Sequence, residues 1–306
     1  MYQSGKELNS TLISNAIYNN GYSPILPGMQ SVGFRTNQML YRENFTLHSV
    51  ADHFFINSMH TRNDSQSVYS IVNYLNDSGV VMVSMNGNND ISSEAIGLSQ
   101  GAPIDLELGN AIVKRRSIRY FTGDLISFDY LSTILRAANG ISSKGLVPLS
   151  SGGEAEFSFR THSSAGALYP VDLYLAVINV GGLNPGIYRF CPKQDVLIKI
   201  TEETSSKKLF HATASSENSV SLFNANVIML FVMTPWKSMR KYGPRGLRFA
   251  FHESGAIAQN IHLSCVALGL GSMDYASFYE DEVNELLELD GISQSFTHAV
   301  VIGCHG

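Results

Sequence analysis

Apolar residues run without interruption from Val227 to Met233, which predicts a strand buried on both of its faces. A similar run over residues 299–304 predicts another strand. Three further strands are expected at Leu173–Val180, Gly186–Phe190 and Val196–Ile200, and the last two are close enough in sequence to form a hairpin. The second half of the chain therefore supplies most of a sheet.

Helical spacing of apolar residues is clearest over residues 131–138, which Ser127 can cap and Gly140 can end. A long apolar helix is expected between Pro244 and Gly269, and shorter ones near residues 106–113 and 283–287. Strands and helices are interspersed, but the predicted hairpin interrupts any regular alternation of strand and crossover helix. This pattern predicts an α+β fold around a mixed sheet.

Residues 1–103 show weaker patterns. Three short elements are expected there: a helix over residues 46–54, a helix over residues 69–75 and a strand over Val80–Met85. Residues 86–103 are rich in Asn, Ser and Gly, which is typical of a loop or linker. We therefore place a boundary there, between an N-terminal extension of unknown role (1–103) and a main domain (104–306).

Composition narrows the class of protein. The 306 residues are 44% hydrophobic and carry a net charge of -5, so the chain can bury a full core and has no general basic field for nucleic acid. Its three cysteines form no CxxC motif, which argues against a disulfide framework or structural zinc site and favours a reducing compartment. The first residues lack the features of a signal peptide, and no apolar window reaches about 18 residues. We expect a cytoplasmic protein that binds neither nucleic acid nor membrane.

Three arginines and a serine lie close together at Arg115, Arg116, Ser117 and Arg119. Arginine forks match phosphate oxygens, and a serine hydroxyl adds a further hydrogen bond, so this cluster suits a phosphate monoester. A cationic helix C-terminus would explain the same residues. The sequence does not distinguish the two interpretations.

Small residues fill the stretch from His162 to Pro170, where backbone could approach a flat ligand closely, although a tight turn would need the same composition. Gln259 and Asn260 lie inside the long apolar helix, where a buried amide needs partners such as a flavin edge or neighbouring backbone. Residues 269–271 read Gly-Leu-Gly, which ends a helix and is too short for a dinucleotide fingerprint.

Lys241 and Tyr242 precede Gly243 and Pro244, so we expect this pair in a loop at the start of the long helix, where both side chains can converge on one atom. Neither is a good base at neutral pH unless burial or nearby cations lower its pKa. A solvated basic loop is the alternative.

The Gly/Ser-rich residues 141–162 are expected to form a long loop that could cover the site. No HExxH motif is present, and metal catalysis is not expected.

In this order, the motifs resemble the flavin-dependent nitroreductase superfamily and, within it, the SagB-type dehydrogenases of thiazole/oxazole-modified peptide biosynthesis. The resemblance covers about the last two-thirds of the chain and rests on five stretches: RRSIRYF (115–121), SSAGALYP (163–170), KYGPRGLRFAFHESGAIAQN (241–260), GLGS (269–272) and AVVIG (299–303). It implies a nitroreductase-like, mainly antiparallel sheet flanked by helices in a domain-sharing homodimer.

In that family an FMN-bound homodimer oxidises azoline rings to azoles, after a YcaO-type cyclodehydratase has made the azolines in a precursor peptide. The resemblance assigns residues as follows: Arg115, Arg116, Ser117 and Arg119 to the FMN phosphate; Ser164, Gly166 and Leu168 to one side of the isoalloxazine; Gln259, Asn260, Gly269 and Gly271 to the other side; Lys241 and Tyr242 to deprotonation of the azoline. Nitroreductases often place a basic residue beyond the last strand near the phosphate, and here that contact is either absent or made by His305.

Two other functions are compatible with the same scaffold. One is a general NAD(P)H-dependent nitro- or quinone reductase, which has no need of the Lys-Tyr pair. The other is a non-catalytic flavin-binding subunit of a synthetase complex, against which the retained Lys241 and Tyr242 argue. The sequence does not tell which of the two residues is the base.

Overall fold

The computed structural model describes residues 54, 58, 69–72, 74, 76–84, 95–202 and 207–306. By its internal contacts the chain divides into two units, Met1–Asn63 and Asp64–Gly306, and the fold described here belongs to the second. The helix expected over residues 46–54 lies outside the described residues except for Phe54, and so do residues 86–94 of the expected linker.

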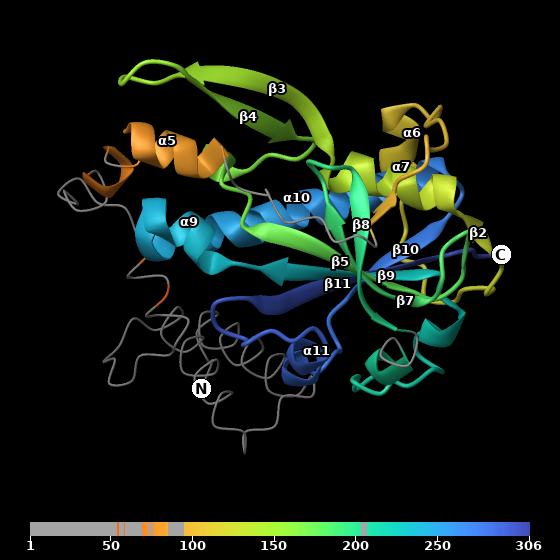
Figure 1. Ribbon diagram of the computed structural model, residues 1–306. Coiled ribbons are helices and arrows are strands. Elements are labelled where there is room, and N and C mark those ends of the chain that lie inside the picture. The colour runs from red at the N-terminus through yellow and green to blue at the C-terminus, as the bar shows by residue number, and fades with distance from the viewer. Residues whose placement is uncertain are drawn as a thin grey trace, which may run out of the picture. The chain divides into compact units, whose positions relative to one another are not determined.

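A seven-stranded sheet in the order β1-β8-β7-β5-β9-β11-β10 forms the centre of this unit (Figure 1). All six neighbouring pairs in it run antiparallel. Its strands are β1 (Ala95–Gly97), β5 (Val171–Val177), β7 (Gly186–Cys191), β8 (Val196–Glu202), β9 (Val227–Met233), β10 (Gly271–Tyr275) and β11 (Ser295–Gly303). Parallel pairing in the described chain is limited to the short β2 (Ile126–Ser127) with β6 (Val180–Gly181) and a bridge between Ser117 and Ser272. The predicted α+β fold with a mainly antiparallel sheet is confirmed.

Alternate residues of the central strands enter two different apolar clusters, one on each face of the sheet. In β9, for example, Met229 belongs to one cluster and Leu230 to the other. This follows from the period of two in a strand, and it explains why a strand covered on both faces reads as an unbroken apolar run. Every residue of β9 is buried, as that run predicted.

Helices flank the sheet. They are α5 (Asp77–Ser84), α6 (Leu108–Lys114), α7 (Phe128–Asn139), α9 (Pro235–Tyr242), α10 (Gly246–Ala267) and α11 (Glu280–Leu286), with short 3-10 turns at Ala165–Ala167, Leu222–Asn224 and Gly243–Arg245. The predicted α7 is confirmed: the Ser127 hydroxyl accepts a hydrogen bond from the Tyr130 amide, and the apolar stripe of the helix is fully buried. The long predicted helix is also confirmed as α10, which packs against α7 and shares its apolar cluster.

The strand expected over Val80–Met85 is wrong, because residues 77–84 form the helix α5. The Asn76 side chain accepts a hydrogen bond from the Gly79 amide at 2.9 Å, which caps the first turn of this helix. A short apolar run does not distinguish a strand from a helix by its periodicity. The capping residue was the signal that could have decided between them.

The long loop expected over residues 141–162 is also wrong, because most of it forms a two-stranded hairpin of β3 (Ile141–Pro148) and β4 (Glu154–Arg160). Gly152 and Gly153 have φ angles of 95° and 88°, so they supply the left-handed turn between the strands. Part of the expected linker is likewise a strand, since β1 pairs with β8. The sheet therefore includes chain from both sides of the boundary near residue 103, while the role of residues 1–103 stays a prediction.

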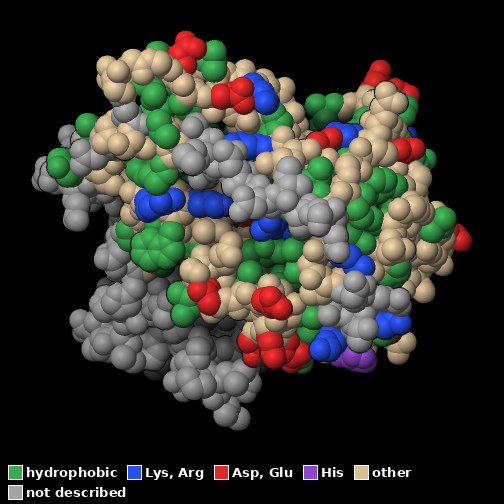
Figure 2. Space-filling model, viewed as in Figure 1, with side chains coloured by type: hydrophobic (Ala, Val, Ile, Leu, Met, Phe, Trp, Pro, Cys, Tyr) green, Lys and Arg blue, Asp and Glu red, His purple; other side chains and the backbone are tan. Residues whose placement is uncertain are grey.

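The surface offers no continuous basic area on the face shown in Figure 2, where Lys and Arg side chains are interspersed with acidic and apolar ones. In the part of the chain that the structure describes, no helix is both long and apolar enough to cross a membrane.

Candidate active site

Lys241 and Tyr242 are the last two residues of α9, not loop residues as expected. Pro235 begins this short helix at its first turn, and Pro244 lies beyond its end in the following 3-10 turn. Pro244 therefore separates α9 from α10, but Lys241 and Tyr242 just before it still belong to α9. Gly243 has a φ of 57° and turns the chain into α10.

The two side chains nevertheless converge, and they do so on the small-residue loop. A Cβ atom at Gly166 would lie 2.7 Å from the Tyr242 hydroxyl and 2.9 Å from Lys241 Nζ. Gly166 also has a φ of 65°, a left-handed backbone conformation that favours glycine. The structure thus brings together Lys241, Tyr242 and Gly166, three of the residues predicted for the site.

Burial changes the two groups in opposite directions. Lys241 is only 8% exposed, and the loss of water around it lowers the pKa of its ammonium. The same effect raises the pKa of the Tyr242 phenol. Desolvation is the cause for Lys241, one of the two causes that the sequence suggested; the nearby cation Lys237 is paired with Asp172 at 2.9 Å. Lys241 is therefore closer to a neutral base, and Tyr242 further from an anion, than in water.

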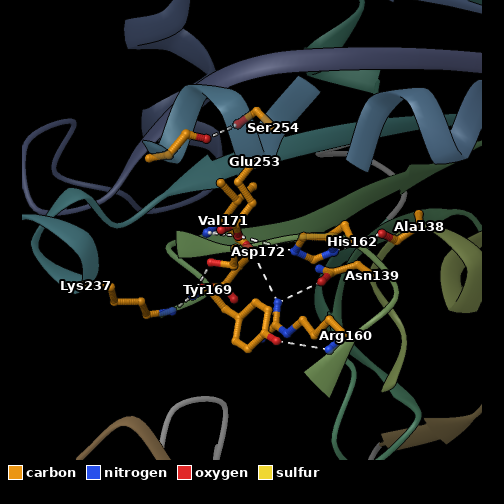
Figure 3. A network of polar contacts seen from close by, with 12 residues as sticks. Ala138, Asn139, Arg160, His162, Tyr169, Val171, Asp172, Lys237, Glu253 and Ser254 are labelled. Carbon is orange, nitrogen blue, oxygen red and sulfur yellow. Dashed lines mark hydrogen bonds and ion pairs between the residues drawn. The ribbon is translucent and has the colours of Figure 1, made fainter. Parts of the chain in front are cut away.

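A buried polar network that the sequence analysis missed fixes the small-residue loop (Figure 3). Glu253 of α10 is 1% exposed, and its Oε1 accepts a hydrogen bond from the Val171 amide and lies 3.4 Å from His162 Nε2. The other ring nitrogen of His162 lies 3.1 Å from the Ala138 carbonyl. Glu253 interrupts the apolar pattern of α10, and this was the signal that could have indicated a buried charge.

Arg160 belongs to the same network (Figure 3). Its guanidinium donates to Asn139 Oδ1 at 2.8 Å and lies 4.5 Å from the centre of the Tyr169 ring, and its amide donates to the Tyr169 hydroxyl. Burial lowers the pKa of Arg160, although nearby carboxylates of Asp172 and Glu253 oppose the shift. These contacts hold the end of β4 and the start of β5 against α7 and α10.

The other predicted residues of the loop take different positions. Ser164 accepts a hydrogen bond from the Tyr169 amide, which closes the turn. The Leu168 side chain is fully buried in the protein, so its backbone is the part that can face a ligand.

The arginine cluster lies at the other end of α10, beside β10. The Ile118 amide donates to the Ser272 carbonyl at 3.1 Å, and a Cβ atom at Gly271 would lie 2.8 Å from the Ile118 Cβ and 3.0 Å from the His305 ring. Gly271 therefore holds the cluster and His305 close together. Gly269, with a φ of 71°, ends α10 as predicted.

The members of the cluster differ in their contacts. Arg116 donates to the carbonyls of Val113 and Arg115, the contacts that the helix-terminus interpretation predicts, and its role toward a phosphate stays a prediction. Arg115 and Arg119 make no ion pair with any described carboxylate, and Ser117 is exposed. Two guanidinium groups and one hydroxyl thus remain for an anion such as a phosphate monoester.

A cavity of about 360 Å³ opens along α10, beside β10 and β11. Its lining residues are Phe251, Ser254, Gly255, Ala258, Gln259, His262, Asp274, Thr297 and His298. Gln259 is exposed in it, whereas Asn260 donates to the Ala137 carbonyl at 3.1 Å, as the backbone-packing interpretation predicted for that residue. Hydrogen bonds from His262 and then His298 hold the pKa of Asp274 well below its usual range.

The Lys-Tyr pair ends α9 just before α10 begins, whereas the arginine cluster lies beside β10, which follows α10, so the two groups stand at opposite ends of this helix. The helix has 22 residues, and at 1.5 Å per residue it spans about 33 Å. This is longer than one FMN molecule. Within a single chain, the Lys-Tyr pair and the arginine cluster are therefore not brought together.

Comparison with known proteins agrees with the fold. Residues 112–304 match the nitroreductase family. The putative nitroreductase MJ1384 of Methanocaldococcus jannaschii is 30% identical over 185 residues, which are 60% of this chain and 86% of that protein. The microcin B17-processing protein McbC of Escherichia coli is 25% identical over 135 residues, 43% of this chain and 49% of McbC. The chain thus matches about half the length of McbC.

Among solved structures, a chain of the E. coli microcin synthetase McbBCD complex with truncated pro-MccB17 bound has the same fold, with a TM-score of 0.51 and 17% identity over 81% of this chain and 99% of that one. The family match extends over well more than half of the 306 residues and ends within the last strand region. The chain therefore belongs to the nitroreductase family, whose members are oxidoreductases that typically bind FMN.

Proposed function

We propose that the protein is an FMN-dependent dehydrogenase that oxidises thiazoline or oxazoline rings of a ribosomal peptide to azoles, beside a YcaO-type cyclodehydratase. The observation that carries the proposal is the convergence of Lys241 Nζ and Tyr242 Oη on Gly166. A plain reductase has no use for a desolvated amine at this place, whereas ring oxidation needs a base. The similarity to McbC and to a chain of the McbBCD complex supports the same substrate class.

The donor set fits FMN. Arg115, Ser117 and Arg119 offer the forks and hydroxyl that a phosphate monoester needs, and His305 lies beside them. Gln259 offers an amide in the cavity along α10, and Gly166 presents bare backbone beside the Lys-Tyr pair. Bound FMN would supply the two-electron acceptor for the reaction.

The chain's own residues would handle the proton. The ring C–H of an azoline is acidified by its neighbouring carbonyl and imine, so a positioned amine can remove it. Lys241 is the better base of the pair because its pKa is lowered, and Tyr242 keeps its proton and can donate a hydrogen bond to the ring because its pKa is raised. In balance, the azoline loses one proton to Lys241 and one hydrogen with two electrons to the acceptor.

A homodimer would complete this site. The Lys-Tyr pair and the arginine cluster are separated by the length of α10, so one FMN can contact both only if a second chain contributes one of them. The exposed apolar side chains of α6 and α10 suit such an interface: Leu108, Ile112 and Val113 on α6, and Phe251 on α10, are each more than half exposed. The proposed dimer thus shares each site between two chains.

Replacing Lys241 with Ala tests the proposal. We expect azole formation to fall at least about 100-fold, the usual contribution of a general base, while FMN absorbance of the purified protein is unchanged. Mass spectrometry of an azoline peptide would follow the loss of about 2 Da per ring that accompanies removal of two hydrogens. Lys208→Ala, which removes an exposed lysine elsewhere, is the matched control. Equal turnover in both variants would refute the role of Lys241.

A general NAD(P)H-dependent reductase is the second candidate, because MJ1384 is described as a putative nitroreductase. Rapid bleaching of the flavin by NADPH, with no change on addition of an azoline peptide, would favour it over the dehydrogenase. A protein that takes up no FMN would exclude both.

A further inference from the structure

Residues 69–72, 74 and 76–84, called here the 69–84 segment, include side chains that contact the end of α9 that carries the Lys-Tyr pair. The hydroxyl of Ser70 lies 3.1 Å from the Lys241 carbonyl and 3.2 Å from the Arg240 carbonyl. The last carbonyls of a helix have no partner within it, so a hydroxyl that donates to them fixes the helix end. Ser70 thus anchors the backbone of Lys241.

Tyr74, from the same segment, covers the side chain of Lys241. The ammonium lies 5.7 Å from the centre of the Tyr74 ring and 5.4 Å from the centre of the Tyr242 ring. Because the pKa of Lys241 is lowered, the exclusion of water by this packing outweighs the attraction of the charge to the ring faces. Gly166 closes a third side. None of the described carboxylates forms an ion pair with this ammonium, and among the described residues two aromatic rings and the backbone of Gly166 lie close to it.

The segment is itself held in place. The guanidinium of Arg240 on α9 lies 3.1 Å from the sulfur of Met82 on α5, and Val83 lines a small cavity with Phe157 of β4 and Tyr169. Figure 1 shows α5 between α9 and the β3–β4 hairpin. A Cβ atom at Gly79 would lie only 2.3 Å from the Tyr74 carbonyl, so the first turn of α5 packs closely against the backbone of Tyr74.

We propose that the 69–84 segment is part of the candidate active site, in which Ser70 and Tyr74 are positioning residues for Lys241. Ser70 holds the backbone from which Lys241 projects, and the Tyr74 ring keeps water from its ammonium. The catalytic role of these two residues rests on the proposed function, whereas their contacts with Lys241 are independent of it. It gives a role to chain outside the family match, which begins at residue 112.

The first test measures the titration of Lys241 directly, by NMR of the full-length protein after ¹³C-methylation of its lysines, with Lys241→Arg to assign the signal. Tyr74→Ala admits water and should raise the pKa of Lys241 toward its ordinary value of 10.5. Tyr74→Phe keeps the ring and should titrate as the wild type. Tyr69→Ala is the control within the same segment, because that side chain is 69% exposed. An unchanged titration in Tyr74→Ala would overturn the proposal.

The second test asks about catalysis. In Tyr74→Ala the acid limb of the pH profile of kcat/KM should move to higher pH by the same amount as the pKa of Lys241. At a pH below this limb, each pH unit of the shift should lower kcat/KM about tenfold. Ser70→Ala should lower kcat with FMN affinity unchanged, and Ser70→Thr, which restores a hydroxyl, should recover it. The two Ser70 variants test the proposal even if Tyr74→Ala fails to fold.

The outcomes separate the two proposals. If the wild type oxidises no azoline but Tyr74→Ala shifts the titration, the proposed function fails and the positioning role stands. If the wild type oxidises azolines and both Tyr74→Ala and Ser70→Ala match it in titration, kcat and pH profile, the positioning role fails and the proposed function stands.

Discussion

At the scale of single residues, the structure treats two charged groups in opposite ways. Lys241 is buried against aromatic rings without a carboxylate partner in the described chain, so its charged form is disfavoured. Asp274 receives hydrogen bonds from two imidazoles and stays ionised. A base must be able to lose its proton near neutral pH, whereas a structural carboxylate need not. This contrast separates the group suited to catalysis from the one suited to holding β10, α10 and β11 together.

The Asp274 contacts predict a pH-dependent stability. A carboxylate whose folded pKa is lowered contributes stability that is fully present above its unfolded pKa, about 3.9, and is lost as the pH falls toward the folded value. We expect Asp274→Asn to lower the free energy of unfolding at neutral pH by less than about 1 kcal/mol, because half of the side chain is exposed and solvent screens it. Urea unfolding should show this difference shrinking below about pH 4. Asp281→Asn on α11 is the exposed control, and a difference that grew on acidification would contradict the assignment.

Residue types gave the site's chemistry but not its contacts. The Lys-Tyr pair and Gly166 could be selected from sequence because glycine next to proline and small residues near a strand are local signals. The Glu253–His162 pair joins residues 91 positions apart in the chain, and Tyr74 lies 167 positions before Lys241, so no local pattern links either pair. For Arg116 the sequence allowed two roles, contact with a phosphate and contact with a helix end. Its hydrogen bonds to the carbonyls of Val113 and Arg115 are helix-end contacts that the residue pattern alone does not reveal.

At the scale of elements, α10 organises the site, because it carries Glu253, Gln259 and His262 and connects the Lys-Tyr pair to β10. The helices α7 and α10 and the strand β9 were predictable, since each buries enough side chains to leave a periodic pattern. The hairpin β3–β4 and the helix α5 could not be predicted from periodicity alone. Their sequences are short or rich in Gly and Ser, and they are ordered by contacts with each other and with α9 that sequence periodicity does not record.

The close packing of β10 against residues 115–119 predicts an effect on FMN binding. In Gly271→Ala the new methyl group would lie 2.8 Å from the Ile118 Cβ, and overpacking of this kind costs about 1–3 kcal/mol. Ile118 is β-branched and has little freedom to move aside. We expect its displacement to move Arg119 and to weaken FMN about tenfold in a fluorescence titration.

Gly109→Ala on α6 is the control for this prediction, since a Cβ atom there would have no neighbour within 4 Å. Equal FMN affinity in both variants would contradict a phosphate site at the arginine cluster.

At the scale of the whole molecule, the separation of the two groups along α10 predicts a dimer. Sedimentation of the purified protein should give about 67 kDa, twice the 33.5 kDa of the chain. Phe251→Glu places a charge on the exposed face of α10 and should lower both the mass and the bound FMN. Ile292→Glu, at a side chain 80% exposed in the loop after α11, should change neither. A monomeric wild type with full FMN content would contradict a shared site.

The length of α10 has a consequence for mixtures of inactive variants. If each site takes its Lys241 from one chain and its Arg119 from the other, Lys241→Ala and Arg119→Ala chains should complement each other. A mixed dimer would contain one site with both defects and one with neither. Random reassortment of the two inactive proteins should then restore about a quarter of wild-type turnover, because half of the dimers are mixed and each has one intact site. If each site lay within a single chain, mixtures of the two variants would show no turnover, and this result would contradict a shared site.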